Sequence, residues 1–190
     1  IDEAQMAQAE WIYLEGYRFD GPESHAAFAK AIAACKAAGG RVSLTLSDPF
    51  CVSRHREAFR AMIRDDVDLL FCNRAEMLSM YETDDFDAAL ALAAAEVAVV
   101  ACTDSANGAY ILSGPDRWHG PADPVQIVDA TGAGDLFAGA FLWALAENYS
   151  LPDCGRIGNI AAGEVIGHIG ARPEQDLKGL IAKAGVVPAT

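Results

Sequence analysis

The chain has 190 residues, of which 52% are hydrophobic, and this fits one ordinary domain with a substantial core. Its 14 basic and 27 acidic residues give a formal net charge of −13, which argues against nucleic acid as a partner. No apolar run approaches the ~20 residues of a membrane span, so we expect no membrane partner either.

The cysteines are five in number, widely spaced and without a C-x-x-C pair. An odd, scattered set of this kind does not indicate a disulfide framework or a zinc site. Because most of them lie in apolar runs, we predict buried, reduced thiols in a cytoplasmic protein.

The first half of the chain alternates between apolar strand-like runs and helical patterns. Strands are expected at 11–17, 41–46, 68–72 and 96–103, and helices at 21–38, 53–64 and 84–95. This order predicts an α/β fold with a parallel sheet and right-handed crossovers. Parallel sheets of this class bind ligands at the carboxyl ends of their strands, where Asp48, Asn73 and Thr103 lie.

The second half begins with a predicted hairpin at 109–114 and 117–122. A strand is expected at 125–128, followed by a glycine-rich turn and an amphipathic helix that opens at Asp135. A long helix rich in small residues is expected from Pro152 to about Gly170, and a last helix at 174–183.

The turn Thr131-Gly132-Ala133-Gly134 precedes a helix and leaves backbone N–H groups unpaired at the positive end of the helix dipole. Such a turn suits an anion, above all phosphate. The carboxylate of Asp135 therefore makes sense if it accepts a proton from a nucleophile that attacks phosphorus. The sequence contains no Walker loop, and the third glycine position of a dinucleotide fingerprint is Phe137.

The string D-x-T-G-A-G-D at 129–135, the Phe-rich helix after it and the pair Gly170-Ala171 resemble the second signature of the ribokinase-like (PfkB) family of carbohydrate and nucleoside kinases. The alternative is an ordinary loop whose glycines serve tight packing. The resemblance implies a three-layer α-β-α fold with a mainly parallel sheet, and transfer of the γ-phosphate of ATP, with Mg²⁺, to a hydroxyl of a sugar or nucleoside. In that reading Asp135 is the general base, and amides around Gly132, Ala133 and Gly134 hold the phosphate.

The segment Asn73-Arg74-Ala75-Glu76 has two interpretations. By pattern alone it is a helix capping box, with Asn73 as the cap and Glu76 three residues later. It also resembles the N-x-x-E motif of the same family, which implies that the pair organises Mg²⁺, with Glu76 acting through metal-bound water. The two interpretations are compatible.

The nucleotide site is expected from the same resemblance. Thr103, Ser105 and Gly108 match a T-x-G-x-x-G-like loop in which Ser105 replaces the first glycine, although Asn107-Gly108 is also a strong turn signal. Thr131 is a further candidate in the signature. Asn159 lies twelve residues before Ala171, where relatives place an adenine-facing side chain; the alternative is a helical Asn among small residues.

Asp129 has two candidate roles, support of a monovalent cation such as K⁺ or bracing of the loop. The four histidines share no spacing, so surface or packing positions are predicted for all of them: His25, His55, His119 and His168. The basic cluster 54–56 is predicted to be a solvated helix start.

Family members run to about 300 residues. We therefore expect the chain to be the C-terminal portion (1–190) of a single kinase domain, whose N-terminal part, with most of the substrate clasp and the lid, is missing. The expected partner is a small-molecule sugar or nucleoside, and a homodimer is one candidate assembly. The alternatives are a non-catalytic nucleotide- or sugar-binding relative of the same fold and a dinucleotide-dependent oxidoreductase, which Phe137 disfavours.

Overall fold

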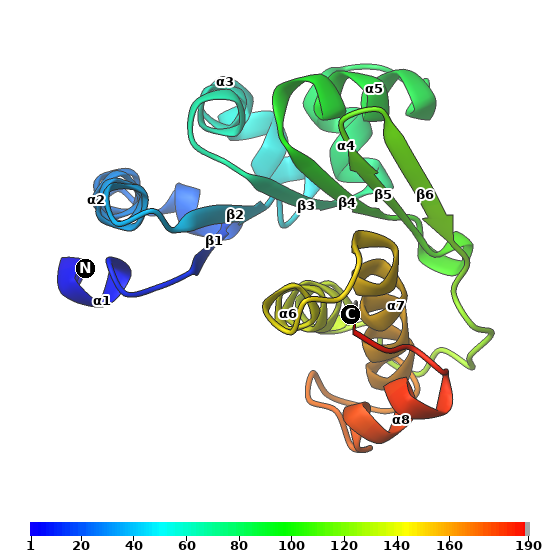
Figure 1. Ribbon diagram of the computed structural model, residues 1–190. Coiled ribbons are helices and arrows are strands. Elements are labelled where there is room, and N and C mark those ends of the chain that lie inside the picture. The colour runs from blue at the N-terminus through cyan, green and yellow to red at the C-terminus, as the bar shows by residue number, and fades with distance from the viewer. Residues whose placement is uncertain (189–190) are drawn as a thin grey trace. The chain divides into compact units, whose positions relative to one another are not determined.

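The structure is a computed structural model that describes residues 1–188. A six-stranded sheet with the order β1-β2-β3-β4-β5-β6 organises the chain (Figure 1). Its strands are β1 (Trp11–Glu15), β2 (Arg41–Thr45), β3 (Leu69–Asn73), β4 (Val99–Thr103), β5 (Ala109–Ser113) and β6 (Asp116–Gly120). The fold is α/β and the sheet is mostly parallel, as the sequence predicts.

The chain divides into two compact units, and the first comprises Ile1–Cys102 with Leu112–Pro115. Its helices are α1 (Glu3–Met6), the 3-10 helix η1 (Gly16–Asp20), α2 (Ser24–Ala37), α3 (Pro49–Asp65), α4 (Arg74–Tyr81) and α5 (Phe86–Glu96). Because consecutive parallel strands are neighbours, right-handed crossovers place their connecting helices on the same face of the sheet. Figure 1 shows α2, α3 and α5 on one side of β1 to β4.

The core of this unit is built on the middle strands. β1 pairs with β2 in parallel, with Leu14 opposite Leu44, and Leu44 in turn lies opposite Leu70 of β3. All three leucines are buried. The one polar side chain of this strand interior, Ser43, is also buried and donates from Oγ to the carbonyl oxygen of Ile12, 2.8 Å away, so its polar group is satisfied.

The second unit comprises Thr103–Ile111 and the chain from Asp116 onward. Its helices are the 3-10 helix η2 (Ser105–Asn107), α6 (Ala133–Ala146), α7 (Leu151–Val165) and α8 (Leu177–Lys183). α6 packs against α7, which also contacts β6 and α8. A Cβ on Gly158 of α7 would come within 2.7 Å of the Phe137 ring of α6, so this glycine permits the close helix contact that the small residues predict.

The expected strand at 125–128 is wrong, because this segment has no strand structure. Its apolar side chains are exposed: Val125, Ile127 and Val128. The N–H of Val128 donates to the carbonyl oxygen of Ile166 at 2.8 Å, at the end of α7. The end of this segment is therefore bonded to a helix end and not to a strand within residues 1–188, since a short β-rich run alone does not supply a neighbouring strand.

α7 is also shorter than predicted, since it ends at Val165 and not near Gly170. The chain then passes through Gly170 with a φ of +104°, which is not a helical conformation and favours glycine. All five cysteines are buried, and none forms a disulfide, which confirms that part of the prediction. Among residues 1–188 we find no helix with the length and apolar character needed to cross a bilayer.

Candidate active site

The start of α6 depends on two glycines with different tasks. Gly132 is the N-cap residue and has a φ of +82°, which favours glycine. A Cβ on Gly132 would lie 2.6 Å from the Cβ of Ala171. The turn thus needs Gly132 both for its backbone angle and for its contact with Ala171, so the two halves of the predicted signature lie together.

Gly134 has a different environment, since no atom of the described residues lies within 4 Å of a Cβ built on it. The N–H groups of Gly134 and Asp135 have no acceptor within the described chain, whereas the N–H of Ala133 donates to the carbonyl oxygen of Ala130 at 3.3 Å. The side chain of Asp135 is exposed in the first turn of α6. The N–H of Gly132 also has no acceptor in the described chain, so the amides open to an anion are those of 132, 134 and 135, whereas the Ala133 amide, which we expected among them, already has a partner.

Asp129 braces the same turn. Its Oδ1 accepts from the N–H of Thr131 at 2.9 Å, and its Oδ2 accepts from the N–H of Gly170 at 3.1 Å. The hydrogen bonds from Thr131, side chain and backbone, and from Gly170 hold the pKa of Asp129 below its usual value. This geometry favours the bracing role over the cation role, although the two do not exclude each other.

Asn73 and Glu76 form the capping box that the sequence predicts at the start of α4. Asn73 Oδ1 accepts from the N–H of Glu76 at 2.9 Å, and Glu76 Oε2 accepts from the N–H of Asn73 at 2.9 Å. Asn73 Nδ2 also donates to Glu76 Oε1 at 2.6 Å. Both carboxylate oxygens are therefore held in fixed positions at the carboxyl end of β3.

The burial of Glu76 is unusual for a carboxylate at a helix start. The residue is only 4% exposed, and burial raises its pKa to about 7, against the lowering effect of the Asn73 hydrogen bond. The carboxylate of Asp48, at the end of β2, contributes to the increase. A bound cation would stabilise the ionised form of such a group, which fits the predicted role near Mg²⁺.

A residue that sequence reasoning missed lies at the same edge of the sheet. Although Tyr17 is 53% exposed, partial loss of water around its hydroxyl raises the pKa of that group, and the carboxylates of Asp48 and Glu76 add to the increase. The N–H of Tyr17 donates to Ser47 Oγ at 3.1 Å, and Ser47 has a φ of +70°. The position of Tyr17 just after a strand was a usable signal, whereas nothing in the sequence indicates the strained backbone of Ser47.

The segment 103–108 forms a compact turn around η2. The N–H of Asp104 donates to the carbonyl oxygen of Gly108 at 2.7 Å, and the N–H of Gly108 donates to that of Ser105 at 3.0 Å. Ser105 has a φ of +49° and Gly108 a φ of +90°. Ser105 thus takes the left-handed conformation that glycine adopts without strain at the position where the family pattern has one.

Asn159 of α7 fastens the chain that leaves β6. Its Nδ2 donates to the carbonyl oxygen of Gly120 at 3.0 Å and approaches that of Pro121 at 3.4 Å. These contacts support a structural role for the amide nitrogen.

The predicted site residues fall in both units. Asn73 and Glu76 belong to the first unit. The second unit contains the phosphate turn and the predicted nucleotide-binding residues: Thr103, Ser105, Gly108, Asp129, Thr131, Gly132, Ala133, Gly134, Asp135 and Asn159. In the first unit Asn73 and Glu76 contact each other. In the second unit Asp129 contacts the N–H groups of Thr131 and Gly170.

Comparison with known families matches residues 1–177 to the model described as "pfkB family carbohydrate kinase". Among curated proteins, an "uncharacterized sugar kinase" from Archaeoglobus fulgidus is 31% identical over 100 residues, which are 53% of this chain and 40% of that protein.

Two solved structures are similar over nearly the whole chain. A "probable sugar kinase protein" from Rhizobium etli CFN 42 superposes with a TM-score of 0.96 and 42% identity, covering 98% of this chain and 57% of that one. An adenosine kinase from Sinorhizobium meliloti gives a TM-score of 0.94 and 41% identity, covering 97% and 57%. The chain therefore spans little more than half the length of these proteins.

Proposed function

The chain belongs to the pfkB family of carbohydrate kinases, and from this membership we propose that it is part of an ATP-dependent kinase that phosphorylates a hydroxyl group of a small sugar or nucleoside. The observation that carries the proposal is Asp135, an exposed carboxylate in the first turn of α6, next to amides of 134 and 135 that have no acceptor in the described chain.

In this reaction the acceptor hydroxyl gives its proton to Asp135, its oxygen forms a bond to the γ-phosphorus, and the bond to the β-phosphate oxygen breaks to release ADP. General-base catalysis of this kind contributes typically ~10²–10⁴-fold. The N–H groups of Gly134 and Asp135 stabilise the charge on the transferring phosphoryl group. Phosphoryl transfer asks the protein mainly to position the reactants and stabilise charge, and these groups serve both tasks.

The remaining residues have supporting roles in the proposal. Asn73 and Glu76 would organise Mg²⁺, with Glu76 acting through metal-bound water, because a hard cation prefers oxygen ligands and Mg²⁺ retains several waters. When bound, the ion neutralises charge on the phosphates. The turn at Thr103, Ser105 and Gly108 contacts the nucleotide.

The acceptor is proposed to be a ribose or related polyol, free or within a nucleoside. The similar solved structures include both a sugar kinase protein and an adenosine kinase, at nearly equal identity. A second candidate function is a non-catalytic nucleotide- or sugar-binding relative, which the exposed Asp135 disfavours.

The test is phosphate transfer from ATP-Mg²⁺ by the full-length protein to adenosine, ribose and fructose. Asp135→Asn should lower kcat by about 10²–10⁴-fold and leave ATP affinity within a few-fold. Asp153→Asn is the matched control, since Asp153 also lies in the first turn of a helix of the second unit, α7. Near-normal turnover in Asp135→Asn would remove the base assignment, and no transfer to any acceptor would favour the non-catalytic alternative.

A further inference from the structure

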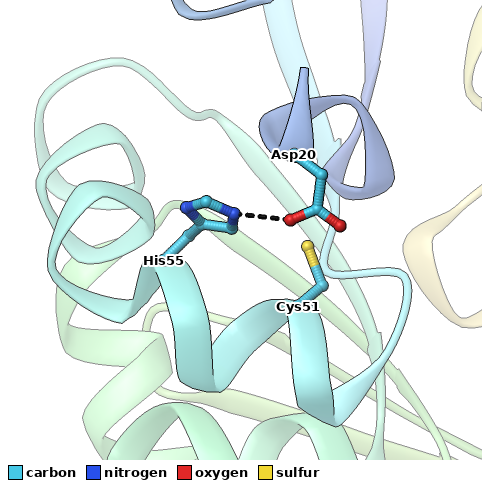
Figure 2. Close-up of side chains that lie close together, drawn as sticks. All are labelled: Asp20, Cys51 and His55. Atoms are coloured by element: carbon cyan, nitrogen blue, oxygen red, sulfur yellow. Dashed lines mark hydrogen bonds and ion pairs between the residues drawn. The ribbon is translucent and has the colours of Figure 1, made fainter. Parts of the chain in front are cut away.

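Three side chains that the proposed kinase reaction does not use meet at one point of the first unit. Asp20 ends η1, and Cys51 and His55 lie in α3, four residues apart and therefore on one face of that helix. One ligand atom from each side chain lies within 4.8 Å of the other two. Figure 2 shows the Cys51 sulfur and the His55 ring both turned toward the carboxylate of Asp20.

The local fold fixes Cys51 at this point. Asp48 caps α3, and its Oδ1 accepts from the N–H groups of Phe50 at 2.7 Å and Cys51 at 2.9 Å. The thiol is fully buried, and Cys51 Sγ approaches the carbonyl oxygen of Gly16 at 3.3 Å. The sulfur is therefore held between the first turn of α3 and the start of η1.

His55 reaches the same point through an irregularity of the helix. Its φ of −122° and ψ of 16° are not helical, and α3 is kinked there. Its Nε2 lies 2.7 Å from Asp20 Oδ1, while its ring contacts that of Phe19, with centroids 5.7 Å apart. This position differs from the solvated helix start that we expected, because α3 begins at Pro49 and His55 lies in its second turn.

The charges around the cluster are mostly negative. Burial raises the pKa of the Cys51 thiol to about 11, and the carboxylates of Asp20, Asp48 and Glu76 add to the increase. The Arg54 guanidinium offsets part of this negative charge near the thiol, and it donates to Asp20 Oδ1 at 3.1 Å and to Oδ2 at 2.6 Å. A divalent cation would therefore enter a region of negative potential. It would bind the Asp20 carboxylate together with the Arg54 guanidinium, which already donates to it.

We propose that Asp20, Cys51 and His55 bind a divalent ion of the zinc class, through a carboxylate oxygen, Sγ and Nε2. One sulfur, one imidazole nitrogen and one carboxylate oxygen are ligands that Zn²⁺ and Co²⁺ prefer, whereas Mg²⁺ prefers oxygen alone. Because the side chain of Asp20 is 47% exposed, water completes a four-coordinate site.

The binding step releases the thiol proton of Cys51 to solvent as the sulfur–metal bond forms, and His55 binds as the neutral imidazole. No electron is transferred. Ligands at about 2.0–2.3 Å from a tetrahedral ion lie farther apart than the 2.7 Å between His55 Nε2 and Asp20 Oδ1, so this pair opens slightly on binding. Arg54 retains its contact with Asp20 Oδ2. The ion would fasten η1 to α3.

The probe is Co²⁺, because a cobalt–thiolate bond produces a charge-transfer absorption in addition to the d–d bands. We expect the full chain, titrated with Co²⁺ at pH 8 in the presence of a phosphine reductant, to bind one equivalent with a thiolate charge-transfer band. Zn²⁺ should abolish the band by competition, and Zn²⁺ should also raise the Tm, because it binds the folded site more tightly than the unfolded chain. Binding should weaken at pH 6, where protons compete for the ligands.

Cys51→Ser should abolish the charge-transfer band, and His55→Gln and Asp20→Asn should weaken Co²⁺ binding at least tenfold. The matched controls are Cys154→Ser, a buried thiol of the second unit, and His25→Gln, whose ring centroid lies 6.1 Å from that of His55. Both controls should retain the band. If Cys51→Ser does not fold, the two surface-accessible variants still decide the question.

The proposal is overturned if the wild-type chain shows no thiolate band, or if the band survives in Cys51→Ser. It is also overturned if His55→Gln and Asp20→Asn bind Co²⁺ as tightly as the wild type does. None of these measurements depends on kinase activity, so the metal site and the proposed reaction stand or fall separately.

Discussion

Asp129 Oδ2 accepts a hydrogen bond from the N–H of Gly170, 3.1 Å away, and this contact joins the glycine-rich turn to a residue 41 positions later. The other oxygen of Asp129 holds the N–H of Thr131 at 2.9 Å. The carboxylate therefore fixes two loops with one side chain, and the geometry of the turn before α6 depends on it.

Replacement of Asp129 should loosen both loops. In Asp129→Ala we expect faster amide hydrogen exchange at Thr131 and Gly170, with a smaller effect in Asp129→Asn, which keeps one acceptor oxygen. Asp116→Ala, at the start of β6, is the control and should leave both amides unchanged. If Asp129 also supports a monovalent cation, K⁺ will slow exchange at these amides in the wild type but not in Asp129→Ala.

Gly132 and Gly134 should respond in opposite ways to an added methyl group. Gly132→Ala should cost about 1–3 kcal/mol in the free energy of unfolding, because φ is positive and the new Cβ meets Ala171. Gly134→Ala lies in open space inside a helix and should stabilise the fold by up to about 1 kcal/mol. Urea unfolding of the three proteins measures both effects.

The Gly134 variant also tests the phosphate site. Gly134→Ala should lower kcat/KM despite its higher stability, because the methyl group occupies space that a phosphate needs. Gly139→Ala is the control, since Gly139 lies in the same helix and a Cβ added to it would also have no atom of the described residues within 4 Å. It should gain similar stability and keep full activity; a loss of activity equal to that of Gly134→Ala would contradict the assignment.

Glu76 should make the protein less stable as the pH rises. Its pKa is about 7 in the folded protein and near 4.5 in the unfolded chain, so the folded state keeps a proton that the unfolded state releases. The free energy of unfolding should therefore fall between pH 4.5 and 7 and then level off. Glu76→Gln keeps an acceptor for the Asn73 N–H, loses the one for Asn73 Nδ2 and removes this fall. At pH 8 the variant should therefore be more stable by about 1–2 kcal/mol.

Replacement of Glu76 should thus have opposite effects on stability and on activity. Glu76→Gln should raise the Mg²⁺ concentration needed for half-maximal turnover even as it stabilises the fold. Glu23→Gln serves as the control, because Glu23 is an exposed carboxylate before α2 without a side-chain cap bond. An unchanged Mg²⁺ titration in Glu76→Gln would leave Asn73 and Glu76 with the capping role alone.

In the turn at 105–108, Ser105→Gly should leave the stability of the fold nearly unchanged, whereas Gly108→Ala should lower it. In Ser105→Gly the relief of left-handed strain, about 1 kcal/mol, is offset by the flexibility that glycine gives the unfolded chain, so stability should change little. Gly108→Ala should destabilise the fold by more than ~2 kcal/mol, because its Cβ would lie 2.0 Å from the carbonyl oxygen of Gly120. A greater than tenfold loss of ATP affinity in Ser105→Gly would show that the hydroxyl itself binds the nucleotide.

Sequence patterns predicted most of the fold because, in the first unit, the helix and strand signals of the sequence match the elements that pack in the structure. The helix 21–38 was predicted within a few residues of α2, and Asn73 and Glu76 form the expected capping box. The segment 125–128 was predicted wrongly, because a short β-rich run forms a strand only where another strand is available to pair with it.

The candidate site was predicted only as far as its motif extends. Asp135 and the glycines lie in one short string, so their proximity follows from the chain itself. The meeting of Asp20 with Cys51 and His55 depends on a kink at His55 and on η1, neither of which has a sequence signal. The spacing of Cys51 and His55 was present in the sequence, but a C-x-x-x-H pair without its third ligand carries little information.

All five cysteines are buried, so their reactivity toward thiol reagents reports local opening of the native structure. Cys35, Cys51, Cys72 and Cys102 lie in the first unit and Cys154 in the second. A thiol-reactive dye can label each of them only when the surrounding structure exposes the sulfur, so labelling rates followed residue by residue by mass spectrometry give a separate opening free energy for each unit. Equal rates would mean that the two units open together, and a faster rate at Cys154 would mean that the start of α7 opens while the first unit stays closed.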